Sequence, residues 1–238
     1  MQELSGVALT TLPDVPGVLY DNYRATLRAF TQALNARDLE TEAHSQRVAA
    51  YSLRLGIVMG LDELSLLGLE QGALLHDIGK IGIRDHILLK PGPLTADERL
   101  TMRSHVQHGL RIVQDVTMLR PARSIIGQHH ERFDGSGYPS GLSGDEIHIH
   151  ARIFAVADAL DALLSDRPYR KAQSFEYAKG ELLANSGTQF DPEVLETFTA
   201  VTQPEWLLLR DETALRTFID MVTGGSAPRW ILGVTHSV

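Results

Sequence analysis

Gln128-His129-His130-Glu131-Arg132-Phe133-Asp134-Gly135-Ser136-Gly137-Tyr138-Pro139 is the stretch around which the rest of the chain is interpreted. Two adjacent histidines end a predicted helix. Vicinal side chains project in different directions from a helix end, so we expect each histidine to reach a different metal ion. The glycines that follow allow a loop to fold close over the site. The remaining chain is interpreted as a scaffold that brings further ligands to this stretch.

Composition excludes several classes of protein and of site. The 238 residues are 43% hydrophobic and 22% charged, as in an ordinary soluble globular protein. The formal net charge of -8 argues against a broad face for a DNA or RNA polymer. Because the chain has no cysteine, any metal ion must be held by histidine and carboxylate. We find no membrane-spanning run and no signal peptide, and therefore expect a cytoplasmic protein.

Apolar periodicity predicts an all-α fold, a helical bundle with functional loops. Apolar residues spaced three or four apart from Leu19 to Leu34 form a stripe that indicates a helix packed on the core. The alternative is that this helix pairs with a second copy of the chain. Other helices are expected over about 39–59, from Asp62 to near Gly79, from Thr95 onward and over about 150–164. Residues 80–94 and 131–147 are expected to be loops. Among the residues predicted to face inward are Val48, Leu55, Val58, Leu64, Leu67, Leu75, Met102, Val106, Leu110 and Val113.

The chain is predicted to have three parts, on the basis of residues that start helices and of an apolar helical period that weakens near the C-terminal end. Thr95 and Glu98 have the spacing of a capping box, and Ser174 and Asp191 are expected to cap two later helices. Residues 1–37 are predicted to form a leader and linker helix, residues 38–200 a catalytic domain, and residues 201–238 a helical extension and tail.

Histidines and carboxylates recur at the ends or inner faces of five predicted helices. Residues 40 and 44 share one helix face, and Asp158 lies in an apolar helix, where a charge is costly to bury unless it is paired or ligated. Taken singly, each has a plainer interpretation: a hydrogen-bonded histidine, a solvated acid or, for Asp158, an ion pair with Arg152 or Arg167. Taken together, they predict a metal centre. The candidate ligands are Glu40, His44, His76, Asp77, His105, His129, His130 and Asp158.

The ligand types and their number indicate more than one ion. Imidazole and carboxylate together suit Fe, Mn, Zn or Ni. One ion takes three or four protein ligands, so eight candidates imply at least two ions, and Asp77, central in the set, is the natural bridge. Two ions about 3.5–4 Å apart form a clamp for in-line attack on phosphorus.

The sequence resembles the HD-GYP domain, a subgroup of the HD-type metal-dependent phosphohydrolases. The resemblance covers roughly residues 38–200, and its most specific parts are His-Asp-Ile-Gly-Lys at 76–80 and His-His-Glu-x-x-Asp-Gly-x-Gly-Tyr-Pro at 129–139. It also runs through residues 41–48, 75–82, 89–95, 151–153, 158–163, 167–170 and 189–192, and it includes His105. The chain departs from the family at Arg84, where proline is frequent. It departs again at His148 and His150, which we expect at the rim of the site.

This resemblance implies an HD-type helical bundle with functional loops at the metal site. It also implies hydrolysis of cyclic di-GMP, a bacterial second messenger, to pGpG and onward to GMP. It implies two or three divalent ions, Fe or Mn in most members, with Zn and Ni left open. Family metal ligands fall on His44, His76, Asp77, His105, His129, His130 and Asp158. A glutamate four residues before the first histidine marks the three-metal members, and Glu40 stands there.

The resemblance also implies contacts with the substrate. Asp77 and Lys80 are the predicted catalytic residues. Phosphate contacts fall on Lys80, Arg167 and Arg170, whose plainer interpretations are a cation at a helix C-terminus and surface charge. Gly137 and Tyr138 are expected to line the substrate loop.

Two other functions stay open from sequence. One is hydrolysis of another nucleotide, such as a cyclic GMP-AMP hybrid or a nucleoside polyphosphate. The other is a binding module that passes cyclic di-GMP levels to a signalling partner. The sequence also leaves a homodimer open.

Overall fold

The structure, a computed structural model, describes residues 15–37, 42–166 and 170–211 together with residues 215, 218, 219 and 222. Within these residues the chain forms helices and no strand, which confirms the predicted all-α fold. None of the described helices is both long and apolar enough to cross a membrane. The elements are α1 (Val15–Asn35), α2 (Glu42–Val58), α3 (Glu63–Leu75), η1 (Ile78–Gly82), α4 (Asp85–Leu88), α5 (Ala96–Arg103), α6 (His105–Val113), η2 (Thr117–Ala122), α7 (Arg123–Gln128), η3 (Gly144–Glu146), α8 (Ile149–Leu164), α9 (Phe175–Ala184), α10 (Pro192–Ala200) and α11 (Gln203–Leu208).

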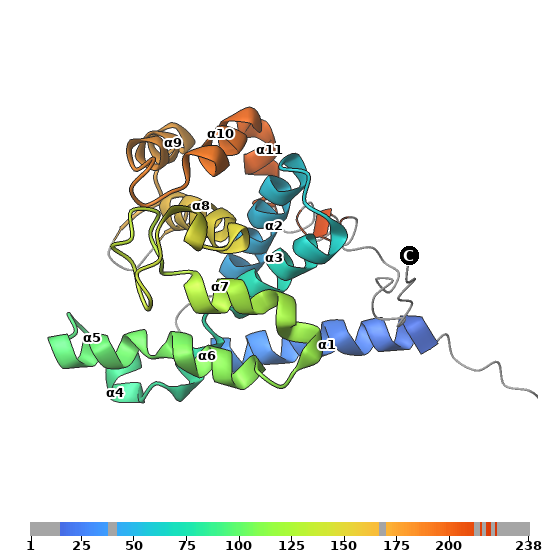
Figure 1. Cartoon of the computed structure of the whole chain (residues 1–238), viewed down its shortest axis with the longest axis vertical. Helices are drawn as coiled ribbons and strands as arrows, with labels where there is room; N and C mark the ends of the chain where they lie inside the picture. Colours follow the sequence, from blue (N-terminus) through green and yellow to red (C-terminus); the bar gives the residue numbers. More distant parts are fainter. Residues whose placement is uncertain are drawn as a thin grey trace, which may run out of the picture.

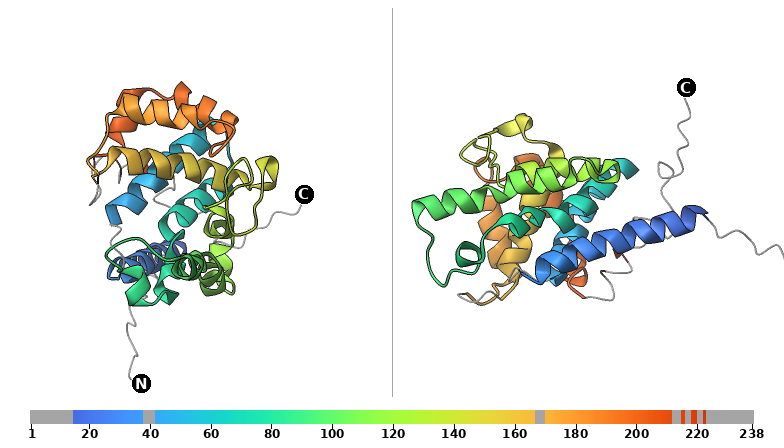
Figure 2. Two further views of the ribbon diagram at one scale, coloured as in Figure 1. Left: turned by 90° about the vertical axis from the view of Figure 1, so that its left-hand side faces the viewer. Right: turned by 90° about the horizontal axis from the view of Figure 1, so that it is seen from below.

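The helices lie in successive layers. Helices α9, α10 and α11 gather at one end of the molecule, and α1, α4, α5 and α6 lie at the other (Figure 1). Between them run α2, α3, α7 and α8, and the left-hand view of Figure 2 shows the same order from another side. The metal-ligand candidates of the described residues therefore come from the middle layers and from the start of α6.

The predicted helix starts are confirmed at four positions. The side chain of Asp62 accepts a hydrogen bond from the backbone N–H of Ser65, and Thr95 and Glu98 form a complete capping box. Ser174 and Asp191 cap α9 and α10 in the same manner. Such caps satisfy backbone N–H groups that the first helical turn leaves without partners.

Helix ends differ from the sequence prediction. Helix α3 ends at Leu75 rather than near Gly79, because the backbone at Asp77 (φ -99°, ψ 7°) leaves the α conformation and enters the short helix η1. The predicted loop 80–94 contains the end of η1 and all of α4. The single helix expected after Thr95 is two helices, α5 and α6, which meet at Ser104, where ψ is -10°.

Two apolar clusters form the core. The larger is built around α2 and α8 and includes Tyr51, Phe154 and Trp206. The smaller joins α1 to α3 and η2, and its members Leu27 and Leu34 place the α1 stripe on the core, as the periodicity predicts. Helices α1 and α11, outside the predicted catalytic domain, thus contribute to the same core as the helices within it.

Two residues predicted to face inward are exposed. The exposed fraction is 40% for Val58 and 51% for Leu64. Both flank the turn at Gly60, whose φ of 74° reverses the chain between α2 and α3. Their side chains therefore lie at the outer end of this helix pair. There the apolar spacing of the helices continues, but the core does not cover the side chains.

Gly79 fixes how closely η1 approaches α6. A Cβ atom on this residue would lie 1.8 Å from the carbonyl oxygen of His105 and 2.4 Å from the backbone nitrogen of Gly109. Backbone atoms cannot move aside as the end of a flexible side chain can, so only glycine fits here. This contact brings the segment that carries Asp77 directly against the start of α6.

Candidate metal centre

Five segments bring the candidate ligands together. His44 lies in the first turn of α2, and Asp158 lies in α8. The pair at 76–77 follows α3, His105 opens α6, and the pair at 129–130 follows α7. Two predicted residues, Glu40 and Arg167, lie outside the described residues. The other seven candidate ligands are described, and they form two connected groups around Asp77.

Asp77 is buried at the centre, and its two carboxylate oxygens face different neighbours. Oδ2 lies 3.1 Å from Nε2 of His76 and 2.8 Å from Nζ of Lys80. Oδ1 lies 3.3 Å from Nε2 of His105 and 3.7 Å from Nε2 of His129. A carboxylate in this position can act as a ligand on both sides.

Four side chains form the tightest group. Asp77, His105, His129 and His130 each offer one ligand atom, and these atoms lie within 4.8 Å of one another. The rings of the two vicinal histidines are 4.0 Å apart. They do not diverge as expected from sequence: both follow the end of α7, and the ring of His130 stacks on Tyr138, with 4.5 Å between the ring centroids.

Backbone carbonyls orient three of the histidines. Nδ1 of His76 lies 2.9 Å from the carbonyl oxygen of Ala73, and Nδ1 of His105 lies 2.8 Å from that of Met102. Nδ1 of His129 faces two carbonyls of α7, at 3.1 and 3.2 Å. A carbonyl can only accept, so each Nδ1 carries the proton and each Nε2 presents a lone pair. This is the tautomer that metal-binding histidines adopt.

The lone pairs converge without a donor between them. Nε2 of His105 and Nε2 of His129 are 3.2 Å apart. The buried Oδ1 of Asp77 receives no hydrogen bond from any described residue, although both nitrogens lie near it. Three acceptors so close repel one another unless a cation lies among them. The residues therefore fit a divalent metal ion on chemical grounds.

Electrostatics keep these groups in the ligating state. Burial lowers the pKa of His129 well below its ordinary value, and it lowers the pKa of His130 to about 3. Burial also lowers the pKa of His105, against the opposing charge of Asp77. For Asp77, burial acts to raise the pKa, but His76 and Lys80 hold it well below its usual range. Neutral imidazoles around an ionised carboxylate form the donor set that metal binding requires.

A second group lies at the other side of the centre. Nε2 of His44 is 3.4 Å from Oδ1 of Asp158, and the rings of His44 and His76 are 6.1 Å apart. The Asp158 side chain is 41% exposed. It contacts neither Arg152, which pairs with Asp191 and Asp145, nor any other arginine of the described residues. The ion pair with Arg152 considered from sequence therefore does not account for it, and Arg167, the other partner considered, lies outside the described residues.

Asp161, which is not among the predicted ligands, orients His44. This fully buried carboxylate lies one helical turn after Asp158, and its Oδ2 is 2.8 Å from Nδ1 of His44. Arg47 donates to both of its oxygens, at 2.5 and 2.9 Å. The surrounding groups lower the pKa of Asp161 to about 2 despite its burial. The spacing of three between two aspartates on an apolar helix is the sequence signal that could have found it.

The residues that surround Asp161 include one from the segment just after α11. Nη1 of Arg210, just after that helix, lies 3.5 Å from Oδ1 of Asp161, and its Nη2 donates to the carbonyl oxygen of Leu164 at 2.8 Å. Trp206 of α11 packs against Tyr51, with 5.6 Å between ring centroids. The chain segment after residue 200 thus reaches the environment of His44.

The residues predicted to bind phosphate lie at different depths. Lys80 lies beside Asp77 with its side chain mostly buried. Arg170 is half-buried, and its Nη2 donates to the carbonyl oxygen of Ala162 in α8. Among the described residues, the cation nearest to the predicted ligands is Lys80.

Hydrogen bonds and close backbone contacts hold the loop after the two histidines against residues 131 and 132. Buried Glu131 accepts hydrogen bonds from the N–H groups of Ser140, at 2.8 Å, and Leu142, at 3.1 Å. A Cβ atom at Gly137 would lie 2.4 Å from the backbone nitrogen of Arg132. Gly135 has a φ of 81°, as a tight reversal requires. The loop is therefore folded close over the site, as expected, and Glu131 is the acid that holds it there.

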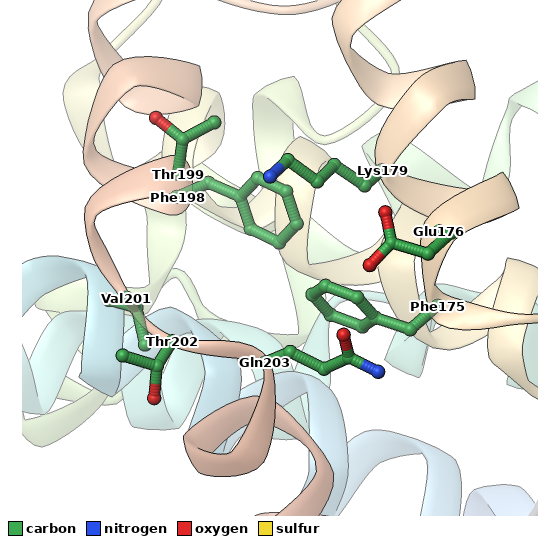
Figure 3. Close-up of a pocket in the computed structure, with 8 residues that line it drawn as sticks. All are labelled: Phe175, Glu176, Lys179, Phe198, Thr199, Val201, Thr202 and Gln203. Carbon is green, nitrogen blue, oxygen red and sulfur yellow. The ribbon is translucent and has the colours of Figure 1, made fainter.

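Two surface hollows lie apart from this centre. One, of about 170 Å³, lies between α9 and the end of α10, and Figure 3 shows Glu176 and Lys179 across it from Phe198 and Thr199. None of the described candidate ligands lines it.

The other hollow has a volume of about 380 Å³ and includes His148 and His150. No hydrogen bond or ion pair among the described residues joins either histidine to a predicted ligand. These two histidines therefore face a separate hollow, not the rim of the metal centre as expected.

Comparison with known proteins gives consistent matches. A family model described as HD domain matches residues 28–194. A cyclic di-GMP phosphodiesterase of Thermotoga maritima is 46% identical over 164 residues, which cover 68% of this chain and 45% of that protein. The 3'3'-cGAMP-specific phosphodiesterase 2 of Vibrio cholerae is 43% identical over 166 residues, covering 69% of this chain and 32% of that protein. The chain thus spans less than half the length of these curated relatives.

A solved structure supports the fold. The cyclic GMP-AMP specific phosphodiesterase V-cGAP3 of V. cholerae aligns with a TM-score of 0.61 at 20% sequence identity. The alignment covers 87% of this chain and 56% of that one. At this identity the likeness concerns the arrangement of helices, and it agrees with the bundle described above.

Proposed function

This chain belongs to the HD domain family, and from that premise we propose that it is a metal-dependent phosphodiesterase that hydrolyses cyclic di-GMP. The observation that carries the proposal is the convergence of unprotonated imidazole nitrogens on the buried Oδ1 of Asp77, which receives no hydrogen bond from the described residues. The relatives named as cyclic di-GMP phosphodiesterases support the choice of substrate. We further propose that this activity is cytoplasmic, as expected from the sequence.

The ligand geometry supports two ions that share Asp77. On one side, His105, His129 and His130 would complete the set with Oδ1. On the other, His44, His76 and Asp158 would complete it with Oδ2. Fe or Mn suits this donor set, which has no thiolate. A third ion would require Glu40, the residue four positions before His44.

The remaining residues have roles that follow from their positions. When bound, the ions would supply activated water and neutralise charge on the phosphoryl oxygens. Lys80, beside Asp77, would add positive charge where the phosphate lies. Arg167 and Arg170 would hold a second phosphate of the dinucleotide, and the loop with Gly137 and Tyr138 would form a wall of the substrate site. Residues 38–200 would form the catalytic domain.

Anaerobic turnover tests the proposal directly. Protein purified without oxygen is loaded with Fe²⁺ or Mn²⁺ and incubated with cyclic di-GMP, and the products are separated by chromatography. We expect pGpG, GMP or both, and chelated protein as a control should give neither. Metal-replete protein that leaves cyclic di-GMP intact would contradict the proposal. Metal content per chain, measured on the same samples, separates two ions from three.

Hydrolysis of 3'3'-cGAMP is a second candidate. Relatives specific for that hybrid are 43% and 37% identical to this chain, close to the values for the cyclic di-GMP enzymes. Both substrates in one competition assay would rank them by kcat/KM.

A further inference from the structure

Tyr138 lies between two other side chains. One face of its ring stacks on His130, with 4.5 Å between centroids and an angle of 21°. The guanidinium carbon of Arg103 lies 4.4 Å from the centroid of the same ring. Arg103 ends α5, two residues before His105. A cation placed over an aromatic ring is attracted to it, so the ring holds the guanidinium in place.

The guanidinium of Arg103 keeps its hydrogen-bond donors available. The residue is exposed, and no described residue accepts a hydrogen bond from its side chain or pairs with its charge. Arg132, in the adjacent loop, differs, since it donates to Ser136 and Gln189. Arg103 thus carries five N–H groups in a fixed fork beside the metal centre, without a partner among the described residues.

The position favours a base over a phosphate as the ligand of Arg103. Phosphate would be held at Asp77, where the metal-ligand candidates and Lys80 converge. A nucleotide base is attached to the phosphodiester through a ribose and therefore lies beyond it. Guanine presents two adjacent acceptors, N7 and O6, which match a guanidinium fork, whereas adenine presents an acceptor beside a donor. Cyclic di-GMP and 3'3'-cGAMP, the substrates named for the relatives, both contain guanine.

We propose that Arg103, held over Tyr138, recognises a guanine of the bound cyclic dinucleotide through its N7 and O6 atoms. The inference rests on the proposed function and adds to it a residue that sets base specificity. It explains how one site would accept either guanine-containing dinucleotide, since each can place a guanine at Arg103. Cyclic di-AMP cannot, and it is expected to bind weakly.

The test compares three cyclic dinucleotides across matched variants. We measure kcat and KM for cyclic di-GMP and 3'3'-cGAMP, and the inhibition constant of cyclic di-AMP as a competitor. Arg103→Ala is expected to raise KM for both guanine substrates about 10- to 100-fold with little change in kcat, and to leave the inhibition constant of cyclic di-AMP unchanged. Arg111→Ala, which removes another exposed arginine one helix further along, is the control and should change none of these values.

Arg103→Lys separates base recognition from simple charge. Lysine restores the charge but not the fork, so it is expected to rescue little of the affinity for guanine substrates. Full rescue by lysine, or an equal loss for all three dinucleotides after Arg103→Ala, would indicate a phosphate contact and overturn the inference. Metal content should match the wild type in every variant, which excludes damage to the neighbouring His105.

Failure of this inference can be told from failure of the proposed function. If the wild type hydrolyses none of the dinucleotides, their dissociation constants are measured on it directly. A guanine preference that Arg103→Ala abolishes would then support the inference while the proposed function falls. Binding of no dinucleotide would overturn both. Hydrolysis of cyclic di-GMP with no preference over cyclic di-AMP would overturn the inference alone.

Discussion

The two sides of the candidate metal centre are built differently. On the side of His105 and His129, these two imidazoles are buried and each is fixed by a backbone carbonyl of the helix that precedes it. On the side of His44, His76 is also fixed by a backbone carbonyl, but the His44 imidazole is fixed by another side chain, Asp161, and the facing carboxylate of Asp158 is 41% exposed. Backbone carbonyls are positioned as soon as a helix forms, whereas a side-chain network depends on contacts from several helices. We therefore expect the first side to tolerate distant changes and the second to be sensitive to them.

The largest effect is expected where the two sides meet. Asp77→Asn keeps the shape of the side chain but removes the charge that faces both groups of histidines. Hydrolysis of cyclic di-GMP should fall on the order of 10³-fold or more, as for groups that act directly on the reacting charge. Metal content should fall on both sides together. Retention of one full equivalent of metal would show that Asp77 is not shared.

The second expected effect is confined to one side. Asp161→Asn offers an amide in place of the carboxylate that accepts from Nδ1 of His44, so the preferred tautomer of the ring is lost. Outer-shell changes of this kind cost about 10- to 100-fold in metal affinity or activity. Titration with Mn²⁺ should show one weakened and one unchanged site. Because Arg47 loses its buried partner, thermal unfolding of the metal-free protein is measured alongside.

The difference between the two sides also limits what the sequence could predict. The all-α fold and the helix caps follow from local patterns, since a cap depends on residues three positions apart, as at Thr95 and Glu98. His105 and His129 were likewise predicted as ligands from sequence, His129 at a helix end and His105 on the inner face of the helix expected after Thr95. Asp161 serves through His44, 117 residues away, and no local pattern fixes such a pair. The exposure of Leu64 and the direction of His130 depend in the same way on how distant segments pack.

A smaller effect is expected at the loop that covers the first side. Glu131→Gln keeps the side-chain size but replaces one of the two oxygens that accept from Ser140 and Leu142. Losing one hydrogen bond to a charged group costs about 1.5–3 kcal/mol, part of which the loop relieves by moving. We expect KM for cyclic di-GMP to rise about tenfold while metal content is unchanged. Lowered metal content would show instead that the loop supports the ligands.

The smallest effect is expected from Arg210, which tests how far the sensitivity of the second side extends. This residue lies 3.5 Å from Asp161, whereas Arg47 lies at 2.5 Å, so its removal should perturb Asp161 less than removal of Arg47 would. Arg210→Ala should lower Mn²⁺ affinity at the His44 side by roughly threefold, a fraction of the 10- to 100-fold effect of a direct outer-shell change. The site at His105 should be unaffected.

Arg54 provides the matched control for Arg210. It also attaches α11 to α2, through an ion pair of 2.7 Å with Glu205, but it makes no contact with Asp161 among the described residues. Arg54→Ala should therefore weaken the docking of α11 and leave both metal affinities as in the wild type. If the two variants lower Mn²⁺ affinity equally, the cause is displacement of α11 as a whole. If only Arg210→Ala does so, the charge at Asp161 is the link between the chain after residue 200 and the metal centre.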